Sequence, residues 1–528
     1  MIMKYRRFFY LLIMLLLAAI AIYTFYKAKQ SSRYPDIYSE KTDGPDFLSF
    51  TLTDGITDYP AFAIVNNLVL VNVPNQGDYS HLRATFQHNG KEVFVNGVIQ
   101  KSGENENDFS DPTKPVVYTL VSSEGKSRNY YIELFDIPVV RINTENNTPI
   151  TNRKDWLKAK LQIIDQDSDK CIEKDILIKG RGNSIGSWKR EKKGYAIKFD
   201  TKESLLGLPE SKRWVLLGHS SDWTRLRTPF CYKLSQIAGF EWAPSGRSVE
   251  LILNDSLRCN YFLSEQILIE KNRIDIQEMT PADTIGESLT GGVLFEVSIE
   301  YDERFKFKTD IGQIPFMFKN PDKKLHSKQF DYFKNYVNNV EKIVYSDERL
   351  LSDEYLKYID IDTFIRWWLV HEMALNTEES GPNHAKNLFI YKNRGDSTKL
   401  TAGPPWDFDW GTFWKQFETT WLCKEIFWYN RFLLSPSFVA QTKKVWEEIK
   451  SNYASNDIDN YFKAIKAYNR FSVLRDHCLF PKKYSSKNVD NIDVNDEDGM
   501  PYDDACQYIK DIFDRHFQWL DNEIVKMQ

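Results

Sequence analysis

The sequence predicts an α+β protein, with a transmembrane helix and a small all-β sandwich preceding a larger mixed domain. Three observations carry this prediction: one long apolar run, a series of short β-rich runs, and a C-terminal region that mixes strand-like with helix-like segments. We therefore expect a transmembrane helix over 1–30, a linker over 31–44, the sandwich over 45–137 and the mixed domain over 138–528.

The apolar run Phe8–Tyr26 contains no charged residue and is long enough to nearly span the hydrocarbon core of a bilayer. Lys4, Arg6 and Arg7 precede it, so the positive-inside rule keeps the N-terminus in the cytoplasm. A cleaved signal peptide is the rival interpretation. Either way the sequence predicts an extracytoplasmic body, in the periplasm or on the cell surface, and the first interpretation predicts membrane attachment through the N-terminal helix.

The composition excludes some classes of function. The net charge of -5 and the pI of about 6.0 argue against a nucleic-acid partner, which a basic domain would bind. None of the six cysteines forms a CxxC pair, which argues against a zinc site. Two alternatives stay open for the cysteines: one or two disulfides in an exported domain, or isolated buried thiols.

Short β-rich runs separated by turn residues predict the sandwich. They cover 48–52, 61–65, 68–73, 82–86, 93–95, 116–121 and 130–134. This stretch resembles the immunoglobulin-like modules that precede catalytic or binding domains in surface proteins of Bacteroidetes-type bacteria. It carries no residue pattern typical of catalysis, so we interpret it as a spacer or an adhesion module.

The first candidate functional segment of the large domain is rich in glycine. It contains Gly180, Arg181, Gly182 and Asn183, and its glycines would let backbone N–H groups approach phosphate oxygens closely. A tight surface turn is the alternative. The next strand-like run places Lys198 among apolar residues, as the lysine that holds the nucleotide phosphates is placed in kinases. Glu265, Glu270 and Glu296 are the acids considered as partners of Lys198, and the sequence does not choose among them.

The last third holds the sharpest pattern. A helix predicted over 364–375 is followed by Glu378, then by Asn387 and a hairpin, and then by Asp407 and Asp409 within Trp406–Gly411. A kinase needs this order, because one carboxylate orients the acceptor hydroxyl while an asparagine and a second acid bind the metal ions. Mg²⁺ prefers such hard oxygen ligands. Capping of a turn is the alternative role for the two aspartates.

At these residues the chain resembles the spore-coat protein H (CotH) kinase family over roughly 138–525. The matching strings are 180–184, 195–198, 254–266, 272–273, 291–292, 316–322 and 403–409. The resemblance implies an atypical protein kinase with a kinase-like fold, which uses ATP with Mg²⁺ or Mn²⁺ to phosphorylate Ser or Thr of exported or surface proteins.

By the same resemblance, Lys198 would bind phosphate, Asp407 and Asn387 would bind metal, and Asp409 would assist. The family usually carries an aspartate where this chain has Glu378, so the catalytic base here has a longer reach. His384 is a second candidate for that base. The alternative function is a non-catalytic surface, adhesion or structural protein on a degenerate kinase fold.

Overall fold

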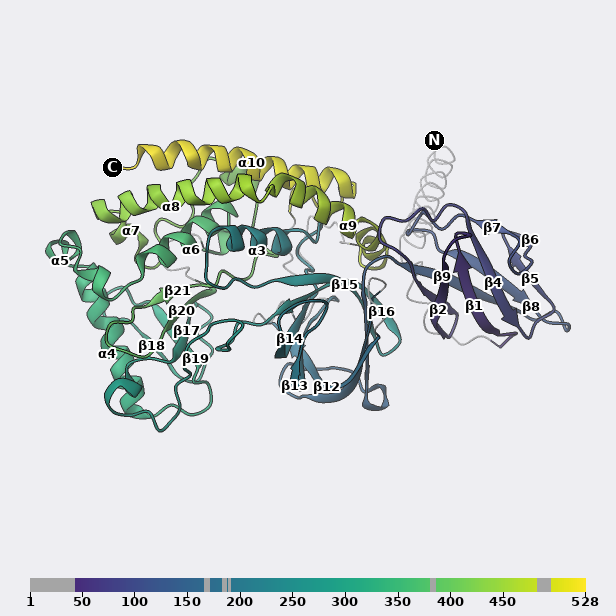
Figure 1. The fold of residues 1–528 in the computed structure, drawn as a ribbon, viewed down its shortest axis with the longest axis horizontal. Helices are drawn as coiled ribbons and strands as arrows, with labels where there is room; N and C mark the ends of the chain where they lie inside the picture. Colours follow the sequence, from purple (N-terminus) through teal and green to yellow (C-terminus); the bar gives the residue numbers. More distant parts are fainter. Residues whose placement is uncertain (1–42, 166–170, 183–187, 189–190, 380–385, 482–494) are drawn as a thin grey trace, which may run out of the picture.

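The computed structural model describes residues 43–165, 171–182, 188, 191–379, 386–481 and 495–528 (Figure 1). The structure contains a β-sheet domain, a closed β-barrel and a region of helices around a third sheet, in this order along the chain except that one helix lies between two strands of the barrel. The α+β class predicted from the sequence is therefore confirmed. The predicted transmembrane run lies outside the described residues, among which no helix combines the length and apolar character needed to cross a membrane.

The N-terminal domain consists of nine strands in the order β6-β5-β8-β9-β3-β2-β1-β4-β7. They are β1 (Phe47–Thr53), β2 (Asp58–Val65), β3 (Leu68–Asn72), β4 (Leu82–His88), β5 (Glu92–Val95), β6 (Val98–Ile99), β7 (Glu106–Asn107), β8 (Val116–Val121) and β9 (Ser127–Phe135). Each β-rich run predicted from the sequence forms a strand. Strand β2 pairs with β1 through its first residues and with β3 through its last, so it passes between two layers. The ring of Phe50 lies 5.3 Å from that of Tyr118 and closes the core between the layers.

Seven strands close a barrel in the order β10-β11-β12-β13-β14-β16-β15. They are β10 (Val139–Thr144), β11 (Leu157–Ile164), β12 (Ile172–Arg181), β13 (Gly194–Glu203), β14 (Ser211–Leu217), β15 (Gly246–Leu253) and β16 (Ser256–Glu265). The parallel pairing of β10 with β15 completes the closure. Alternate side chains, such as Ile178, Ile197 and Trp214, fill the interior.

The third region packs helices around a sheet of order β18-β19-β17-β20-β21. Its strands are β17 (Val293–Val297), β18 (Lys306–Lys308), β19 (Pro315–Asn320), β20 (Leu388–Lys392) and β21 (Thr401–Ala402). The helices are α3 (Arg227–Ile237), α4 (Ser327–Val344), α5 (Asp347–Leu351), α6 (Ile361–Met373), α7 (Tyr429–Phe432), α8 (Pro436–Ser455), α9 (Ile458–Leu479) and α10 (Tyr502–Lys526). The predicted hairpin forms, because β20 and β21 pair through Ile390 and Ala402.

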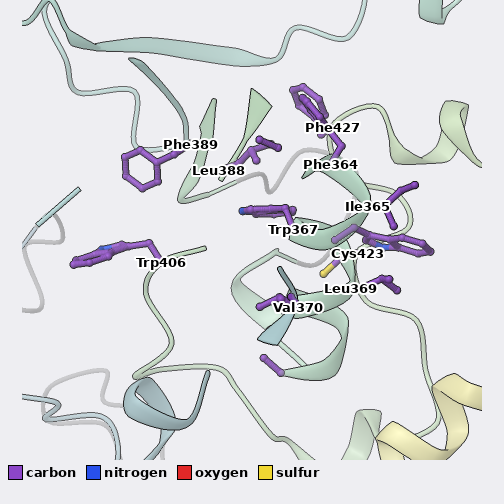
Figure 2. Close-up of a cluster of buried hydrophobic side chains, with 14 of the residues drawn as sticks. Phe364, Ile365, Trp367, Leu369, Val370, Leu388, Phe389, Trp406, Cys423 and Phe427 are labelled. Atoms are coloured by element: carbon purple, nitrogen blue, oxygen red, sulfur yellow. The ribbon is translucent and has the colours of Figure 1, made fainter. Parts of the chain in front are cut away.

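Helix α6 is the centre of this region and is buried almost all round. Figure 2 shows its side chains Phe364, Trp367 and Val370 in one apolar cluster with Leu388 and Phe389, which belong to β20. The helix predicted over 364–375 is confirmed, with a start three residues earlier. All six cysteines are free in the structure, and Cys231, Cys259, Cys423 and Cys506 are buried, as the buried-thiol alternative expects.

Replacing Glu372 of α6 by glutamine is expected to lower the free energy of unfolding by about 1–3 kcal/mol. The buried carboxylate accepts three N–H bonds, from Trp368 Nε1 at 3.0 Å, Leu422 N at 2.9 Å and Cys423 N at 2.8 Å. An amide must turn its own NH₂ towards at least one of these donors. Urea unfolding measures the loss. The exposed Glu348→Gln on α5 should change stability by less than about 0.5 kcal/mol, and equal losses in both variants would contradict the argument.

Candidate active site

The acidic segment Trp406–Gly411 is held against the C-terminal end of α6. Thr377 begins the short helix η4 (Thr377–Glu379), and it donates from its backbone N–H and its hydroxyl to the Gly411 carbonyl at 2.8 and 2.9 Å. Asn376 links η4 to α6, because the Glu378 N–H donates to Asn376 Oδ1 at 3.1 Å and the Asn376 N–H donates to the carbonyl of His371 in α6 at 3.1 Å. The acidic segment and Glu378 therefore share one anchored loop region.

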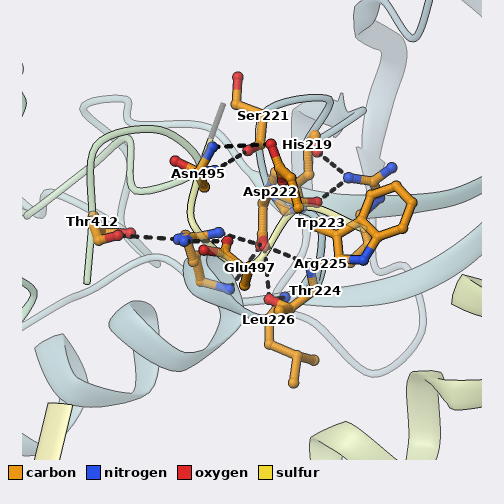
Figure 3. Close-up of polar contacts among 12 residues, drawn as sticks. His219, Ser221, Asp222, Trp223, Thr224, Arg225, Leu226, Thr412, Asn495 and Glu497 are labelled. Atoms are coloured by element: carbon orange, nitrogen blue, oxygen red, sulfur yellow. Dashed lines mark hydrogen bonds and ion pairs between the residues drawn. The ribbon is translucent and has the colours of Figure 1, made fainter. Parts of the chain in front are cut away.

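A buried ionic network fixes the other side of the segment. The Arg227 Nε donates to the Thr412 carbonyl at 3.2 Å, and the Thr412 hydroxyl donates to the Phe408 carbonyl at 3.1 Å. Asp222 and Glu497 neutralise the guanidinium at 3.1 and 2.5 Å. Figure 3 shows this network around Thr412, Asp222 and Glu497. Because the paired charges are fully buried, moving the segment would separate them in a medium of low polarity, which is costly.

Asp407 and Glu378 come together as the sequence order predicts. Burial, and after it the charge of Glu378, raises the pKa of Asp407 to about 7. Burial also raises the pKa of Glu378, and the charge of Asp409 adds to that shift. Lys386 opposes it, with its Nζ 3.4 Å from Glu378 Oε1. The acidic segment and η4 thus bring together carboxylates that disfavour one another's ionised forms.

Arg181, at the end of β12, is a cation that faces these acids. Its guanidinium lies over the ring of Trp406, 5.6 Å from the centroid. Burial lowers the pKa of Arg181, and Asp407 opposes that shift more than Tyr232 or Asp409 does. The glycine-rich segment and the acidic segment, more than 200 residues apart in sequence, therefore meet through Arg181.

Two lysines that the sequence reasoning gave no role extend the site. Lys319 of β19 lies 2.9 Å from Glu296 of β17 and 2.7 Å from Glu303. Lys386 also lies 3.7 Å from Glu300. Lys319 and Lys386 thus each contact an acid in the connection between β17 and β18. Their sequence signals were faint: Lys386 directly precedes Asn387, and Lys319 lies inside one of the family-like strings.

None of the acids considered as partners of Lys198 pairs with it. They pair with other cations: Glu265 with Arg273 at 3.8 Å, Glu270 with Lys202 at 2.8 Å and Glu296 with Lys319 at 2.9 Å. Lys198 belongs to the outer wall of the barrel, because Ile197 beside it fills the interior. The proposed pairing of Lys198 with Glu265, Glu270 or Glu296 is therefore wrong, since each of these carboxylates has a different partner.

The glycine-rich segment has a packing role at its first glycine. The Gly180 N–H donates to Asn152 O at 3.2 Å, and a Cβ here would lie 2.1 Å from the Trp188 ring. Its N–H is thus already engaged. Gly182, directly after β12, has φ +122°, a conformation that side chains disfavour. Asn183 lies outside the described residues, as does the second base candidate, His384.

The predicted metal ligands have the right chemistry. Asn387 and Asp407 both have left-handed backbone conformations, with φ of +51° and +68°, which Asn and Asp adopt more readily than other side chains. Among the described residues, no three His, Cys, Asp or Glu side chains are grouped as a metal centre would need. Burial first, and then the charge of Glu378, disfavours the ionised form of Asp407, and a divalent cation held by Asp407, Asp409 and Asn387 would favour it.

Comparison with known proteins identifies the family of the chain. The family model described as CotH kinase protein matches residues 178–511, more than half of the chain. The chain belongs to the CotH kinase family. The family match starts on β12, three residues before Arg181, and ends within α10. It therefore contains Arg181, Glu378 and Asp407.

No curated protein matches the chain. Among solved structures, it is similar to a candidate glycoside hydrolase from Bacteroides thetaiotaomicron, with 15% sequence identity and a TM-score of 0.16. The similarity covers 34% of this chain and 53% of that one. This TM-score is too low to support any inference about fold or activity.

Proposed function

We propose that this CotH-family chain is an atypical protein kinase that transfers a phosphoryl group from ATP, with Mg²⁺ or Mn²⁺, to Ser or Thr of exported or surface proteins. The single observation that supports it best is the joint, partly buried position of Asp407 and Glu378 with Arg181 as a neighbouring cation. A kinase-like fold brings a metal-binding acid, a base and a phosphate-binding cation together in this way.

The roles follow from side-chain chemistry. Asp407, Asn387 and Asp409 would hold the metal, and Arg181 and Lys198 would hold phosphate oxygens. Glu378 would orient the acceptor hydroxyl and accept its proton as the new oxygen–phosphorus bond forms and the bond to the leaving ADP breaks. When bound, the metal–nucleotide complex supplies the phosphoryl group and neutralises its charge.

Glu378 suits the role of base despite replacing the usual aspartate. Burial raises its pKa, which makes its carboxylate a better proton acceptor. Lys386 contacts one of its two oxygens, at 3.4 Å, and so restrains the longer side chain. We infer that the extra methylene is accommodated by this contact.

The acceptor and the location are part of the proposal. The apolar run 8–26 and its basic flank favour an extracytoplasmic site of action, where exported or surface proteins are the available acceptors. Attachment through an N-terminal helix would keep the enzyme at the membrane. Fold alone does not define an acceptor, so proteins from the exported fraction are the first substrates to test.

The test compares the full-length chain with Glu378→Gln. With radiolabelled ATP, Mg²⁺ or Mn²⁺ and exported proteins as acceptors, the natural chain should transfer label to Ser or Thr, and the variant should transfer it about 100-fold more slowly. Calorimetry should give both proteins similar affinity for ATP with metal, because Glu378 acts on the acceptor. Absence of both transfer and ATP binding in the natural chain would contradict the proposal and favour a non-catalytic surface protein.

A further inference from the structure

Three neighbouring strands of the barrel present a basic face to the outside. The interior of the barrel receives Ile178, Ile197 and Trp214 from these strands. Because side chains alternate along a strand, their neighbours point outward: Lys179 on β12, Lys198 on β13 and Arg213 on β14. We call these three residues the outer basic face.

The cations of this face lie close together. Lys198 and Arg213 are directly opposite each other in the β13–β14 pair. Side chains in that position have Cβ atoms about 5 Å apart, and like charges there are destabilising. Burial lowers the pKa of Lys179, and the charge of Arg213 lowers it further. The face therefore concentrates positive charge at a cost to the folded protein.

Carboxylates of the described residues form no ion pair with these three cations. In the part of the chain that the structure describes, no ion pair joins Lys179, Lys198 or Arg213 to an acid, whereas other lysines of the same strands are paired. Lys174 of β12 lies 3.1 Å from Glu203, and Lys202 of β13 lies 2.8 Å from Glu270. Lys179 Nζ lies over the Trp156 ring, 4.9 Å from its centroid, and Asp200 shares the outward side of β13 with Lys198 without an ion pair to it. Lys198 and Arg213 therefore keep charge that an anion could use.

The outer basic face leads towards the acidic segment. Lys179 and Arg181 are two residues apart and on the same side of β12, which separates them by about 6.6 Å. Arg181 in turn faces Asp407. Ala196 and Gly194 share the outward side of β13, so the centre of the face carries no long side chain. A linear anion could therefore extend along it from Lys198 and Arg213 to Arg181.

We propose that the outer basic face binds the phosphate chain of the nucleotide, with Lys179 and Arg213 acting beside Lys198. Three cations at neighbouring positions fit a ligand with several negative charges better than a single carboxylate or sulfate. This inference rests on the proposed function for its choice of nucleotide, while the choice of a polyphosphate rests on the face itself.

The test uses the full-length chain and two probes, inorganic tripolyphosphate without metal and ATP with Mg²⁺. Arg213→Gln and Lys198→Gln should each weaken binding of both probes about 10-fold, and Arg213→Lys should bind nearly as the natural chain does. Lys202→Gln is the matched control, because it removes a cation of the same strand that is already paired with Glu270. It should leave both affinities unchanged. Thermal unfolding checks that each variant is folded. If Lys198→Gln is not folded, the result for Arg213→Gln alone decides the inference.

The outcomes separate this inference from the proposed function. Loss of binding in Arg213→Gln, with no phosphoryl transfer by the natural chain, would support the anion face and refute the kinase. Unchanged binding in Arg213→Gln, or an equal loss in Lys202→Gln, would overturn the inference even if transfer occurs. Binding of tripolyphosphate without binding of ATP would overturn the assignment to a nucleotide.

Discussion

Asp407→Asn is expected to reduce phosphoryl transfer about 1000-fold, a loss of about 4 kcal/mol of transition-state stabilisation. Asparagine has the shape of aspartate and tolerates the left-handed conformation at φ +68°, so the backbone should stay in place. The change removes the negative charge that a divalent cation needs. Alanine would add backbone strain, which makes asparagine the sharper replacement.

The same substitution should stabilise the metal-free fold. An acid whose folded-state pKa is raised, here to about 7 from the ordinary 3.8, lowers stability progressively as the pH rises above 3.8, and the full cost is reached above about pH 7. Above pH 7 the variant should therefore unfold at a higher temperature than the natural chain. Mg²⁺ should raise the unfolding temperature of the natural chain but not that of the variant.

An exposed acid near Glu296 serves as the control for Asp407→Asn. Asp302→Asn removes an exposed charge near the site, since Asp302 raises the pKa of the Glu296 carboxyl, and it should leave transfer within about twofold. If Asp407→Asn transfers phosphate as fast as the natural chain, Asp407 does not hold the metal. If both variants lose activity equally, the total negative charge near the site matters, and Asp407 has no special role as a metal ligand.

Local patterns in the sequence predicted the elements well. Alternating apolar residues identified the strands of the N-terminal domain, and the long apolar helix with Trp367 at its centre identified α6. The order of Glu378, the hairpin and Asp407 also predicted that two carboxylates would meet, because each lies within a few residues of an element that the pattern identifies. These features depend on neighbours in the chain.

The features that the sequence left open depend on distant neighbours. Closure of the barrel requires β10 to pair with β15, about 110 residues later, and no local pattern encodes that pairing. The partner of each acid was likewise undetermined: Arg273 pairs with Glu265, while Lys198 faces the outside. A lysine between apolar residues indicates a strand. Which side chains of that strand point into the barrel and which point outward is determined by how the barrel closes.

The N-terminal domain was interpreted as a spacer, yet its contacts are those of an integrated part. Leu68, Leu70 and Phe135 share one apolar cluster with Ile252 and Leu257 of the barrel. Helix α9 lies against both parts (Figure 1). A flexible spacer would bury neither apolar surface nor charge at such a junction.

Arg475 of α9 is the residue on which this junction depends most. It is fully buried, and its guanidinium lies 3.6 Å from Glu133 of β9 and 3.2 Å from Glu250 of β15. It also donates to the Leu134 carbonyl. One cation thus serves two acids from two domains. Burial raises the pKa of nearby Asp136 to about 7 even though Arg475 opposes that shift.

Arg475→Met is therefore expected to lower the free energy of unfolding by about 3–5 kcal/mol, because it leaves two buried acids without their shared cation. Acids with raised pKa values cost least when protonated, so the loss should be smaller at pH 5 than at pH 8. Glu250→Gln in the same chain should recover part of it.

Arg470→Met, which removes an exposed arginine of α9 paired with Asp503 at 3.2 Å, should cost less than about 1 kcal/mol. Urea unfolding of the four proteins measures these values. If Arg475→Met costs no more than Arg470→Met, the ion pairs of Arg475 do not hold the junction, and the shared apolar cluster alone joins the two domains. If the larger loss is found, the N-terminal domain helps to hold the barrel wall and α9 in place, which a spacer would not do.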